Sequence, residues 1–228
     1  MKVLGLIPAR IGSKGIPKKN IKLFNGKPLI SYSIKNALDS NFITHTIVST
    51  DSKEIADIAI DYGAMVPFLR PKKLASDVAT DLPVMKHAIE WFKSNNVIFD
   101  YMVFLRPTNV FKTPFDIDKT VEKIIGSDFD SVRSISEVGY NPYWMKKTAD
   151  ENLIDFIDSK FSESRRQDLP VVYQANGAID VIDIKTIELK NSRYGDNIGY
   201  YLMDDISRTD IDSKLDFEVA EILFKKHM

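Results

Sequence analysis

The 228-residue chain contains no cysteine, which excludes disulfides, thiolate catalysis and zinc sites with cysteine ligands and is compatible with a reducing compartment. Only three histidines are present, and their scattered positions (His45, His87 and His227) indicate no histidine triad or zinc site. No apolar run approaches the length of a membrane span, and the run Val3–Ile7, which Pro8 ends, is too short for a signal-peptide core. We therefore expect a cytoplasmic protein with no membrane partner.

The chain also has no large excess of positive or negative charge: it contains 31 basic and 32 acidic residues, and its formal net charge is −1. A general nucleic-acid binder is usually basic overall, so that class is disfavoured. With 44% hydrophobic and 28% charged residues, the chain suits a globular protein with one sizeable core. Acidic residues are absent locally, however: the first carboxylate is Asp39, and eight lysines and arginines precede it.

Most of these cations lie in or beside residues 7–20, which read IPARIGSKGIPKKN. The apolar run Val3–Ile7 predicts a buried strand that leads straight into this glycine-containing, cation-rich loop. Such a loop suits a polyphosphate, because glycine lets backbone N–H groups approach oxygen closely while lysine and arginine neutralise charge. The spacing matches neither a Walker motif nor a dinucleotide fingerprint. The alternative is a solvated basic loop with turns at Gly12 and Gly15, but the local absence of acids favours an anion site.

Strand-like and helix-like segments alternate over the first 135 residues. The predicted strands are Val3–Ile7, Thr46–Ser49, Ala64–Phe68, Tyr101–Leu105 and Ser131–Ile135. The predicted helices run from Pro28 to about Ser40, Ser52 to Tyr62, Leu82 to about Ser94, Pro114 to Ile125 and Lys214 to Phe224. Apolar strands separated by amphipathic helices imply an α/β fold with a doubly wound, mainly parallel sheet. Ligands of such sheets bind beyond the carboxyl ends of the strands, where the basic loop, Asp51 and Arg106–Asn109 are expected.

The character of the chain changes between about residues 137 and 170, which are polar with isolated aromatic residues. The apolar pattern returns at Ala178–Ile184 and Tyr200–Met203. No repeat or interdomain linker is evident. We therefore predict one domain, residues 1–228, with a small excursion over about 137–170 that serves dimerisation or caps the substrate.

The clearest candidate metal site is Asp210-Ile211-Asp212, just before the last helix. Two carboxylates at i and i+2 on an extended segment point to the same side. They could hold Mg²⁺, which takes few protein carboxylates and completes its shell with phosphate and water. The alternative is helix capping, with Asp212 or Ser213 as N-cap and Asp216 in the first turn. Spacing alone does not choose between the two.

Three further polar segments are weaker signals. Paired Arg165 and Arg166 suit phosphate or carboxylate recognition, although the charge pattern slightly favours an exposed loop with ion pairs. Residues 70–77 form a loop between a strand and a helix that could line a pocket or supply turn and capping residues. Asp51, followed three residues later by Glu54, favours a capping box over a catalytic role.

Taken in order, these motifs resemble those of the CMP-acylneuraminate synthetases, which are cytidylyltransferases for nine-carbon sugar acids. The resemblance is carried by residues 7–20, Ser49–Asp51, Arg70–Pro71, Leu74–Asp77, Arg166–Pro170, Asn176–Ala178 and Asp210–Asp212. It covers nearly the whole chain and implies a Rossmann-like nucleotidyltransferase fold, a homodimer and a part in cell-surface polysaccharide synthesis. The implied reaction joins CMP from CTP to a 2-keto-3-deoxy sugar acid and releases pyrophosphate, with Mg²⁺ or, as an alternative, Mn²⁺.

The resemblance also implies roles for individual residues. The nucleotide would be bound by Arg10, Gly12, Ser13, Lys14, Lys19, Asn20, Arg70, Ala75, Ser76 and Asp77. Catalysis would depend on Arg10, Lys19, Asp210 and Asp212, with the two aspartates as metal ligands. The sugar would be bound by Arg106, Thr108, Arg166, Gln167, Asn176 and Asp180, with Arg166 supplied by the partner subunit.

The chain departs from the family pattern on the sugar side. Arg106 stands where the family usually has Gln, Asp180 stands where it usually has Tyr, and Ile11 replaces a glycine or polar residue in the basic loop. We therefore expect a sugar other than plain N-acetylneuraminate, such as a legionaminate, a pseudaminate or an amino-octulosonate. An Arg106–Asp180 ion pair inside the pocket would satisfy both charges.

Other functions remain alternatives at this point. A glycosyltransferase that uses a nucleotide sugar also combines a basic loop with Asp-x-Asp, but here that motif follows the sheet near the C-terminus. A nucleotide-binding protein without turnover would not need Arg10, Lys19, Asp210 and Asp212. An octulosonate cytidylyltransferase is the nearest enzymatic alternative. No general base is evident, and a metal-bound hydroxide or a metal-bound substrate oxygen would suffice.

Overall fold

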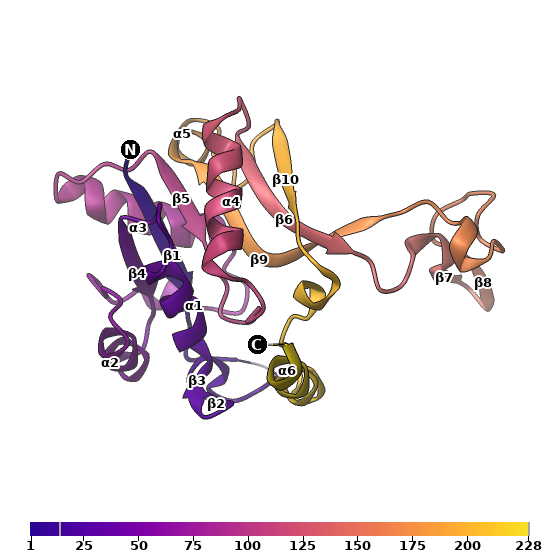
Figure 1. The fold of residues 1–228 in the computed structure, drawn as a ribbon, viewed down its shortest axis with the longest axis horizontal. Coiled ribbons are helices and arrows are strands. Elements are labelled where there is room, and N and C mark those ends of the chain that lie inside the picture. Colours follow the sequence, from indigo (N-terminus) through magenta and orange to yellow (C-terminus); the bar gives the residue numbers. More distant parts are fainter. Residues whose placement is uncertain (14, 228) are drawn as a thin grey trace.

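The computed structural model describes residues 1–13 and 15–227, and its centre is a six-stranded sheet (Figure 1). The strand order is β10-β6-β9-β5-β1-β4. These strands are β1 (Val3–Pro8), β4 (His45–Ser49), β5 (Tyr101–Phe104), β6 (Ser131–Glu137), β9 (Tyr173–Asp183) and β10 (Ile198–Leu202). Only β9 runs antiparallel to its neighbours β5 and β6, and the other pairings are parallel. The predicted mainly parallel α/β sheet is confirmed.

Helices cover both faces of this sheet, as a doubly wound fold requires. The helices are α1 (Leu29–Leu38), α2 (Lys53–Asp61), α3 (Asp81–Ser94), α4 (Pro114–Ile125), α5 (Ile184–Leu189) and α6 (Lys214–His227). One apolar cluster joins α1, α2 and α4 to one face, and a second joins α3 and α5 to the other. Side chains of β1 alternate between the two clusters, since successive residues of a strand point to opposite faces. No helix within the described residues is both long and apolar enough to span a membrane.

Short elements connect these layers. Two hairpins are formed by β2 (Leu23–Phe24) with β3 (Lys27–Pro28) and by β7 (Lys146–Ala149) with β8 (Asn152–Asp155). Single 3₁₀ turns are η1 (Lys19–Ile21), η2 (Lys72–Leu74), η3 (Pro142–Trp144), η4 (Arg166–Asp168) and η5 (Asp205–Arg208).

A third apolar cluster lies under the polar segments that carry the predicted site. Ile16 of the basic loop and Ile211 of the Asp-Ile-Asp motif are both buried in it, together with Phe217 of α6. Because Ile211 is fully buried, its neighbours Asp210 and Asp212 are left at the surface. The apolar residue between the two carboxylates therefore anchors the segment and exposes both acids.

The segment between β6 and β9 projects from the body of the molecule as an arm, which ends in the β7–β8 hairpin (Figure 1). We define the arm as residues 138–172. Several large apolar side chains are exposed on it, among them Tyr140, Leu153 and Phe156. The arm coincides with the excursion expected from the sequence, and its role in dimerisation stays a prediction.

Two local predictions are wrong. Residues Ala64–Phe68 form no strand: Met65 makes an isolated parallel bridge to Ile47, and Leu69, just beyond the segment, makes another to Thr50. Pro67 lies between these bridges and has no N–H to donate, which prevents a continuous ladder. The short helix α5 was not expected, because the single turn Ile184–Leu189 is too brief to show a helical period.

The predicted capping box of α2 is also wrong. The N-cap is Ser52, whose hydroxyl accepts a hydrogen bond from the Ile55 N–H at 3.4 Å. Asp51 accepts the N–H of Ile11 at 3.0 Å, and Glu54 pairs with Lys18 at 2.7 Å. Both carboxylates therefore hold the basic loop against the start of α2.

Candidate active site

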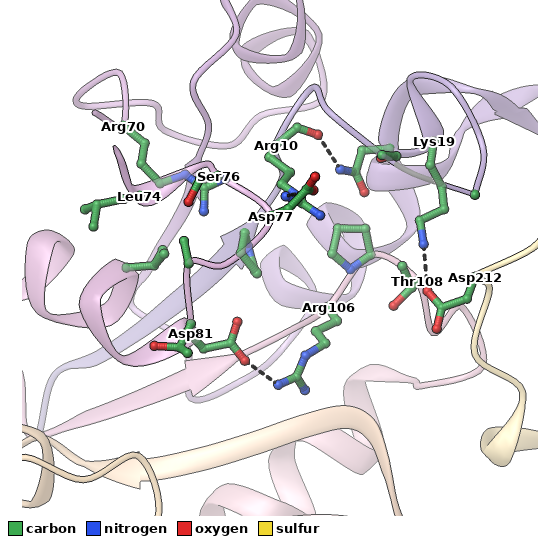
Figure 2. A pocket seen from close by; sticks show the side chains of 18 residues that line it. Arg10, Lys19, Arg70, Leu74, Ser76, Asp77, Asp81, Arg106, Thr108 and Asp212 are labelled. Carbon is green, nitrogen blue, oxygen red and sulfur yellow. Dashed lines mark hydrogen bonds and ion pairs between the residues drawn. The ribbon is translucent and has the colours of Figure 1, made fainter. Parts of the chain in front are cut away.

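A cavity of about 480 Å³ opens at the carboxyl ends of β1 and β5 (Figure 2). The predicted site residues that line it are Arg10, Ser13, Lys19, Asn20, Arg70, Ser76, Asp77, Arg106, Thr108 and Asp212. Parallel strands bring their carboxyl ends to the same edge, so loops distant in sequence converge there. Of the other predicted residues, Lys14 lies outside the described residues, and Gly12, Ala75, Arg166, Gln167, Asn176, Asp180 and Asp210 do not line the cavity.

Arg10 follows β1 and crosses to the loop that precedes α3. Its Nη1 donates to Asp77 Oδ1 at 2.8 Å and, at 3.4 Å, to the carbonyl of Ala75. The Arg10 carbonyl in turn accepts a hydrogen bond from Asn20 Nδ2 at 2.9 Å. The basic loop and the 70–77 loop are thereby joined across the mouth of the cavity (Figure 2).

Lys19 connects the basic loop to the Asp-Ile-Asp segment. Its Nζ donates to the Ile211 carbonyl at 2.6 Å and to Asp212 Oδ1 at 2.9 Å. The side chain of Lys19 is only 12% exposed, whereas that of Asp212 is 77% exposed. Gly15 lies against the same segment, since a Cβ added there would collide with the Asp212 carbonyl oxygen. Glycine at position 15 therefore permits the close approach of the two chains.

The capping alternative for Asp212 has a clear outcome. The start of α6 is capped by Ser213 and Asp216: Ser213 Oγ accepts the Asp216 N–H at 3.2 Å, and Asp216 Oδ2 accepts the Ser213 N–H at 2.7 Å. The Asp212 side chain is not needed for this cap and turns to Lys19. The capping alternative is therefore confirmed with Ser213 and Asp216. The magnesium site at Asp210 and Asp212 stays a prediction.

Asp210 and Asp212 suit a magnesium ion by their chemistry, since carboxylate oxygens are its usual protein ligands and both side chains are exposed. Ile211 N–H donates to the Thr108 carbonyl at 3.0 Å, which ties the segment to the loop after β5. Among the described residues no cluster of three acidic or histidine side chains surrounds a common point. A bound ion would therefore take its remaining ligands from phosphate and water.

Arg70 is a charged side chain with unmet hydrogen-bonding capacity. It is 6% exposed, and its Nε and Nη2 have no hydrogen-bond partner within the described residues. Burial lowers the pKa of its guanidinium, against the opposing effect of Asp51. Buried donors without partners are costly, so Arg70 is suited to hydrogen-bond a ligand in the cavity that it lines.

Arg106 follows β5 and forms the ion pair with Asp180 that its sequence suggested. Its Nη1 lies 3.2 Å from Asp180 Oδ2 and also donates to the Gly177 carbonyl at 3.2 Å. Its Nη2 donates to Asp81 Oδ2 at 2.8 Å. Asp180 itself is 1% exposed. Arg106 therefore lines the cavity while Asp180 supports it from behind.

The remaining predicted sugar residues take other places. Asn176 is buried in a network in which its side chain bonds Ser134 and Ser136, and its carbonyl accepts from Asn109. It shapes the irregular step in the pairing of β6 with β9 and does not face the cavity. Arg166 and Gln167 lie in η4 on the arm and are exposed.

Sequence reasoning missed two residues, Asp81 at the cavity and Lys112 buried behind it. Asp81 lines it beside Arg106 (Figure 2), but in the sequence it looks like an ordinary acid in the first turn of a helix. Lys112 is fully buried beneath the loop after β5, where its Nζ donates to the carbonyls of Arg106 and Asn109. Burial lowers the pKa of Lys112 to about 7. No local pattern in the sequence marks Lys112 as a buried cation.

A cation-lined cavity at the strand ends of a doubly wound α/β sheet is typical of proteins that bind anionic ligands such as nucleotides. The chain matches the Cytidylyltransferase family over residues 4–226 and belongs to that family, so it is a nucleotidyltransferase. It is 36% identical to the CMP-N,N'-diacetyllegionaminic acid synthase of Legionella pneumophila, over 99% of this chain and 97% of the relative. It is also 36% identical to the pseudaminic acid cytidylyltransferase of Campylobacter jejuni, again over 99% of this chain and 97% of the relative.

Among solved structures, the fold is similar to that of a CMP:2-keto-3-deoxy-manno-octonic acid synthetase complexed with CTP. The TM-score is 0.75, the sequence identity is 15%, and the match covers the whole of both chains. At this identity the likeness concerns the fold. It agrees with the nucleotidyltransferase fold expected from the sequence.

Proposed function

We propose that the protein transfers CMP from CTP to the anomeric hydroxyl of a nine-carbon 2-keto-3-deoxy sugar acid and releases pyrophosphate. The observation that carries this proposal is the set of three cations, Arg10, Lys19 and Arg70, around one cavity that Asp212 also lines. A triphosphate and a sugar acid are both anionic, and such a cavity neutralises them. The names of the relatives, a legionaminic acid synthase and a pseudaminic acid cytidylyltransferase, support a nonulosonate as the acceptor.

The reaction forms a bond between the anomeric oxygen and the α-phosphorus and breaks the bond from that phosphorus to the bridging oxygen of pyrophosphate. Such transfers depend on positioning and charge neutralisation more than on a protein nucleophile. Lys19 and Arg10 would bind the phosphate oxygens, on which negative charge increases as pyrophosphate leaves. Arg70 would use its two unpartnered nitrogens to fix an acceptor group of CTP. The anomeric hydroxyl loses its proton to solvent or to a base still to be identified.

We further propose that Asp210 and Asp212 hold a Mg²⁺ ion, with Mn²⁺ as a substitute. The ion would neutralise phosphate charge and lower the pKa of a coordinated hydroxyl. Lys19 donates to Asp212 at 2.9 Å, so metal binding would require this lysine to move toward the phosphates. Lys19 would then leave Asp212 and bind the phosphates when CTP and its metal ion bind.

We propose that the active unit is a cytoplasmic homodimer, with the arm at the interface. Exposed apolar side chains such as Tyr140, Leu153 and Phe156 are typical of a surface that another protein covers. Arg166 and Gln167 lie on the arm and not at the cavity of their own subunit. They would serve the cavity of the partner, as the resemblance implies. A cytoplasmic site fits the use of CTP as substrate.

The test is pyrophosphate release with Mg²⁺ and CTP across eight- and nine-carbon keto-deoxy acids, with ATP, GTP and UTP as nucleotide controls. We expect CTP-dependent release with a nine-carbon acid. The variant Lys19→Ala should lower kcat/KM by at least about 100-fold, because it removes a charge-assisted contact to the leaving group. The control is Lys53→Ala, whose side chain is exposed and pairs with Asp57 outside the cavity.

The nearest alternative is transfer to an eight-carbon octulosonate, which the fold of the solved CTP complex also accommodates. Strict preference for the eight-carbon acids in the same assay would favour it. CTP binding without release for any acid would indicate a protein without turnover. No CTP binding would overturn the proposal.

A further inference from the structure

A second cavity, of about 480 Å³, lies between α1, the β2–β3 hairpin and α6, which Figure 1 shows grouped at one end of the molecule. We call it the α1 pocket, after the helix that supplies Ser31, Tyr32, Lys35 and Asn36 to its wall. Within the described residues, none that lines it also lines the candidate active site. Small-molecule sites usually measure about 300–1,000 Å³, so this pocket is large enough for a ligand of its own.

Two buried oxygen atoms at the α1 pocket have no hydrogen-bond partner within the described residues. The first is Oγ of Ser31, a residue that is only 3% exposed. The second is Oδ1 of Asn25, in the turn between β2 and β3, whose Nδ2 donates to the Glu221 carbonyl at 3.4 Å. Both residues line the pocket. Buried polar atoms without partners are costly and uncommon, so the pair indicates a ligand that supplies the missing hydrogen bonds.

The charge that lines the α1 pocket is positive. Lys27 and Lys35 both line it, and neither forms an ion pair within the described part of the chain. No acidic residue among those described lines the pocket. Glu221 lies beyond Asn25, where it accepts the Asn25 N–H at 3.0 Å and lines a separate cavity. Two cations without an acid between them favour an anionic ligand.

Aromatic rings supply much of the apolar wall, and they come from Tyr32, Tyr62 and Phe224. Tyr32 is held in place, because its hydroxyl donates to the Phe24 carbonyl at 2.7 Å and its ring meets that of Phe224 edge to face at 5.1 Å. Tyr62 is 38% exposed and packs against no other aromatic ring of the described residues. Its ring is therefore available to stack with a flat group of a ligand.

The loop after β5 separates the α1 pocket from the candidate active site. Val110, which is 1% exposed, lines the α1 pocket, whereas Arg106 and Thr108 of the same loop line the other cavity. Helix α1 holds this wall in place, since Asn36 Nδ2 donates to the Lys112 carbonyl at 2.6 Å. A ligand in the α1 pocket is thus separate from one in the active site.

We propose that the α1 pocket is a second nucleotide site, which binds a nucleoside monophosphate. The phosphate pairs with Lys27 and Lys35, and the base lies against Tyr62. An N–H donor of the base meets the free acceptor Asn25 Oδ1, and a ribose hydroxyl meets Ser31 Oγ, which can donate or accept. An aliphatic acid would leave the aromatic wall unused, and an uncharged ring compound would leave both lysines unpaired. This site goes beyond the proposed reaction, which needs the active-site cavity alone.

The test counts the CMP molecules bound per chain by equilibrium dialysis. For the wild type we expect two sites. The double variant Lys27→Gln with Lys35→Gln should weaken one of them by at least about tenfold, because charge-assisted contacts to the phosphate are lost. Lys19→Ala should weaken only the other, which is the active site. Each site is thereby assigned by the variant that weakens it.

Further variants and ligands test the other parts of the proposed contact. Tyr62→Ala should weaken the second site by about fivefold or more, as expected when a base loses its stacking partner. Ser31→Ala should weaken it by about threefold. Cytidine lacks the phosphate and ribose 5-phosphate lacks the base, so each should bind there at least about tenfold more weakly than CMP.

The matched control is Lys53→Gln with Lys119→Gln, which also removes two exposed lysines. Each of these pairs with an acid on its own helix, outside the α1 pocket. This control should bind CMP as the wild type does. Thermal melts establish folding, and Tyr62→Ala is the deciding variant if the double variant at Lys27 and Lys35 fails to fold.

Three results would overturn the inference. The first is complete loss of CMP binding in Lys19→Ala, and the second is unchanged binding in both the double lysine variant and Tyr62→Ala. The third is binding of ribose 5-phosphate as tight as that of CMP, which would mean a site for a simple anion. Because dialysis needs no turnover, the second site can be found even if no pyrophosphate is released, in which case only the proposed reaction fails.

Discussion

Lys19 and Asp212 are separated by 193 positions in the sequence, yet Lys19 Nζ lies 2.9 Å from Asp212 Oδ1. The contact joins the loop after the first strand to the segment before the last helix. Ile16 and Ile211, buried in one apolar cluster, hold the two segments together. Apolar packing thus positions a cation and a carboxylate at the edge of one cavity.

Asp212→Asn should lower kcat at saturating CTP by at least about 100-fold, since it removes a proposed metal ligand and the partner of Lys19. The Mg²⁺ concentration for half-maximal rate should rise. A metal titration of the pyrophosphate assay measures both effects. Asp205→Asn is the control, because Asp205 is exposed and its ion pair, with Arg208 at 3.4 Å, lies within its own 3₁₀ turn. A wild-type rate and metal dependence for Asp212→Asn would exclude Asp212 as a ligand.

Arg70→Met should stabilise the ligand-free protein and weaken CTP binding. The substitution removes a buried charge with two unpartnered nitrogens, and an uncompensated buried charge is destabilising. We expect the melting temperature to rise by about 2–4 °C per kcal/mol of stability gained. The affinity for CTP should fall by about tenfold or more. Thermal melts with and without CTP test both; a lower melting temperature together with an undiminished CTP shift would contradict this account.

Gly15→Ala should displace the basic loop from the Asp212 segment. The added methyl group meets the Asp212 carbonyl oxygen, a backbone atom that cannot rotate away. We expect a loss of stability of about 1–3 kcal/mol, typical of overpacking, together with a large loss of activity. Chemical denaturation measures the first. Gly126→Ala is the control, because its new Cβ would lie 3.6 Å from the nearest atom; equal stability of the two variants would count against the close approach.

Lys112 should make stability depend on pH. Burial lowers its pKa to about 7 from the ordinary 10.5, so between these values the unfolded chain binds a proton that the folded protein lacks. The penalty for burying the charge is complete below pH 7 and is relieved as pH rises. Stability should therefore increase with pH across this window by up to about 1.4 kcal/mol per unit relative to Lys112→Met.

Denaturation of both proteins from pH 6 to pH 9 in metal-free buffer measures this difference. The carbonyls of Arg106 and Asn109 lose their donor in Lys112→Met, which lowers stability by an amount independent of pH. Only the pH-dependent part of the stability difference therefore reports the protonation of Lys112. Parallel stability curves for the two proteins would mean that Lys112 stays charged when folded.

Periodicity predicted most elements but not their direction. The apolar run Ala178–Ile184 gave no direction, and all of it but Ile184 lies in β9, which is antiparallel to β5 and β6. An apolar run reads the same in either direction, so only the connections on the folded sheet decide this. Ala64–Phe68 is the opposite case: its composition predicted a strand, but Pro67 lacks an N–H donor and no strand forms.

The candidate site was predictable where its residues are contiguous in sequence. The basic loop and the Asp-Ile-Asp motif each carry their own signal, and Arg10, Lys19 and Asp212 all line the cavity. Asp81 and Arg193 gave no such signal. In the sequence each looks like an ordinary surface charge. In the folded protein the two side chains form an ion pair with each other.

The sequence by itself determined the fold class and the place of the basic loop, because strand period, helix period and local clusters of charge are short-range properties. Its ordered motifs determined the family. Tertiary structure alone decided which charges meet. In the structure Asp51 bonds the basic loop and does not cap the helix, and Lys112 is buried. Arg106 pairs with Asp81 as well as with Asp180. The physical reason is that the cost of a buried charge is met only by partners that distant segments bring to it.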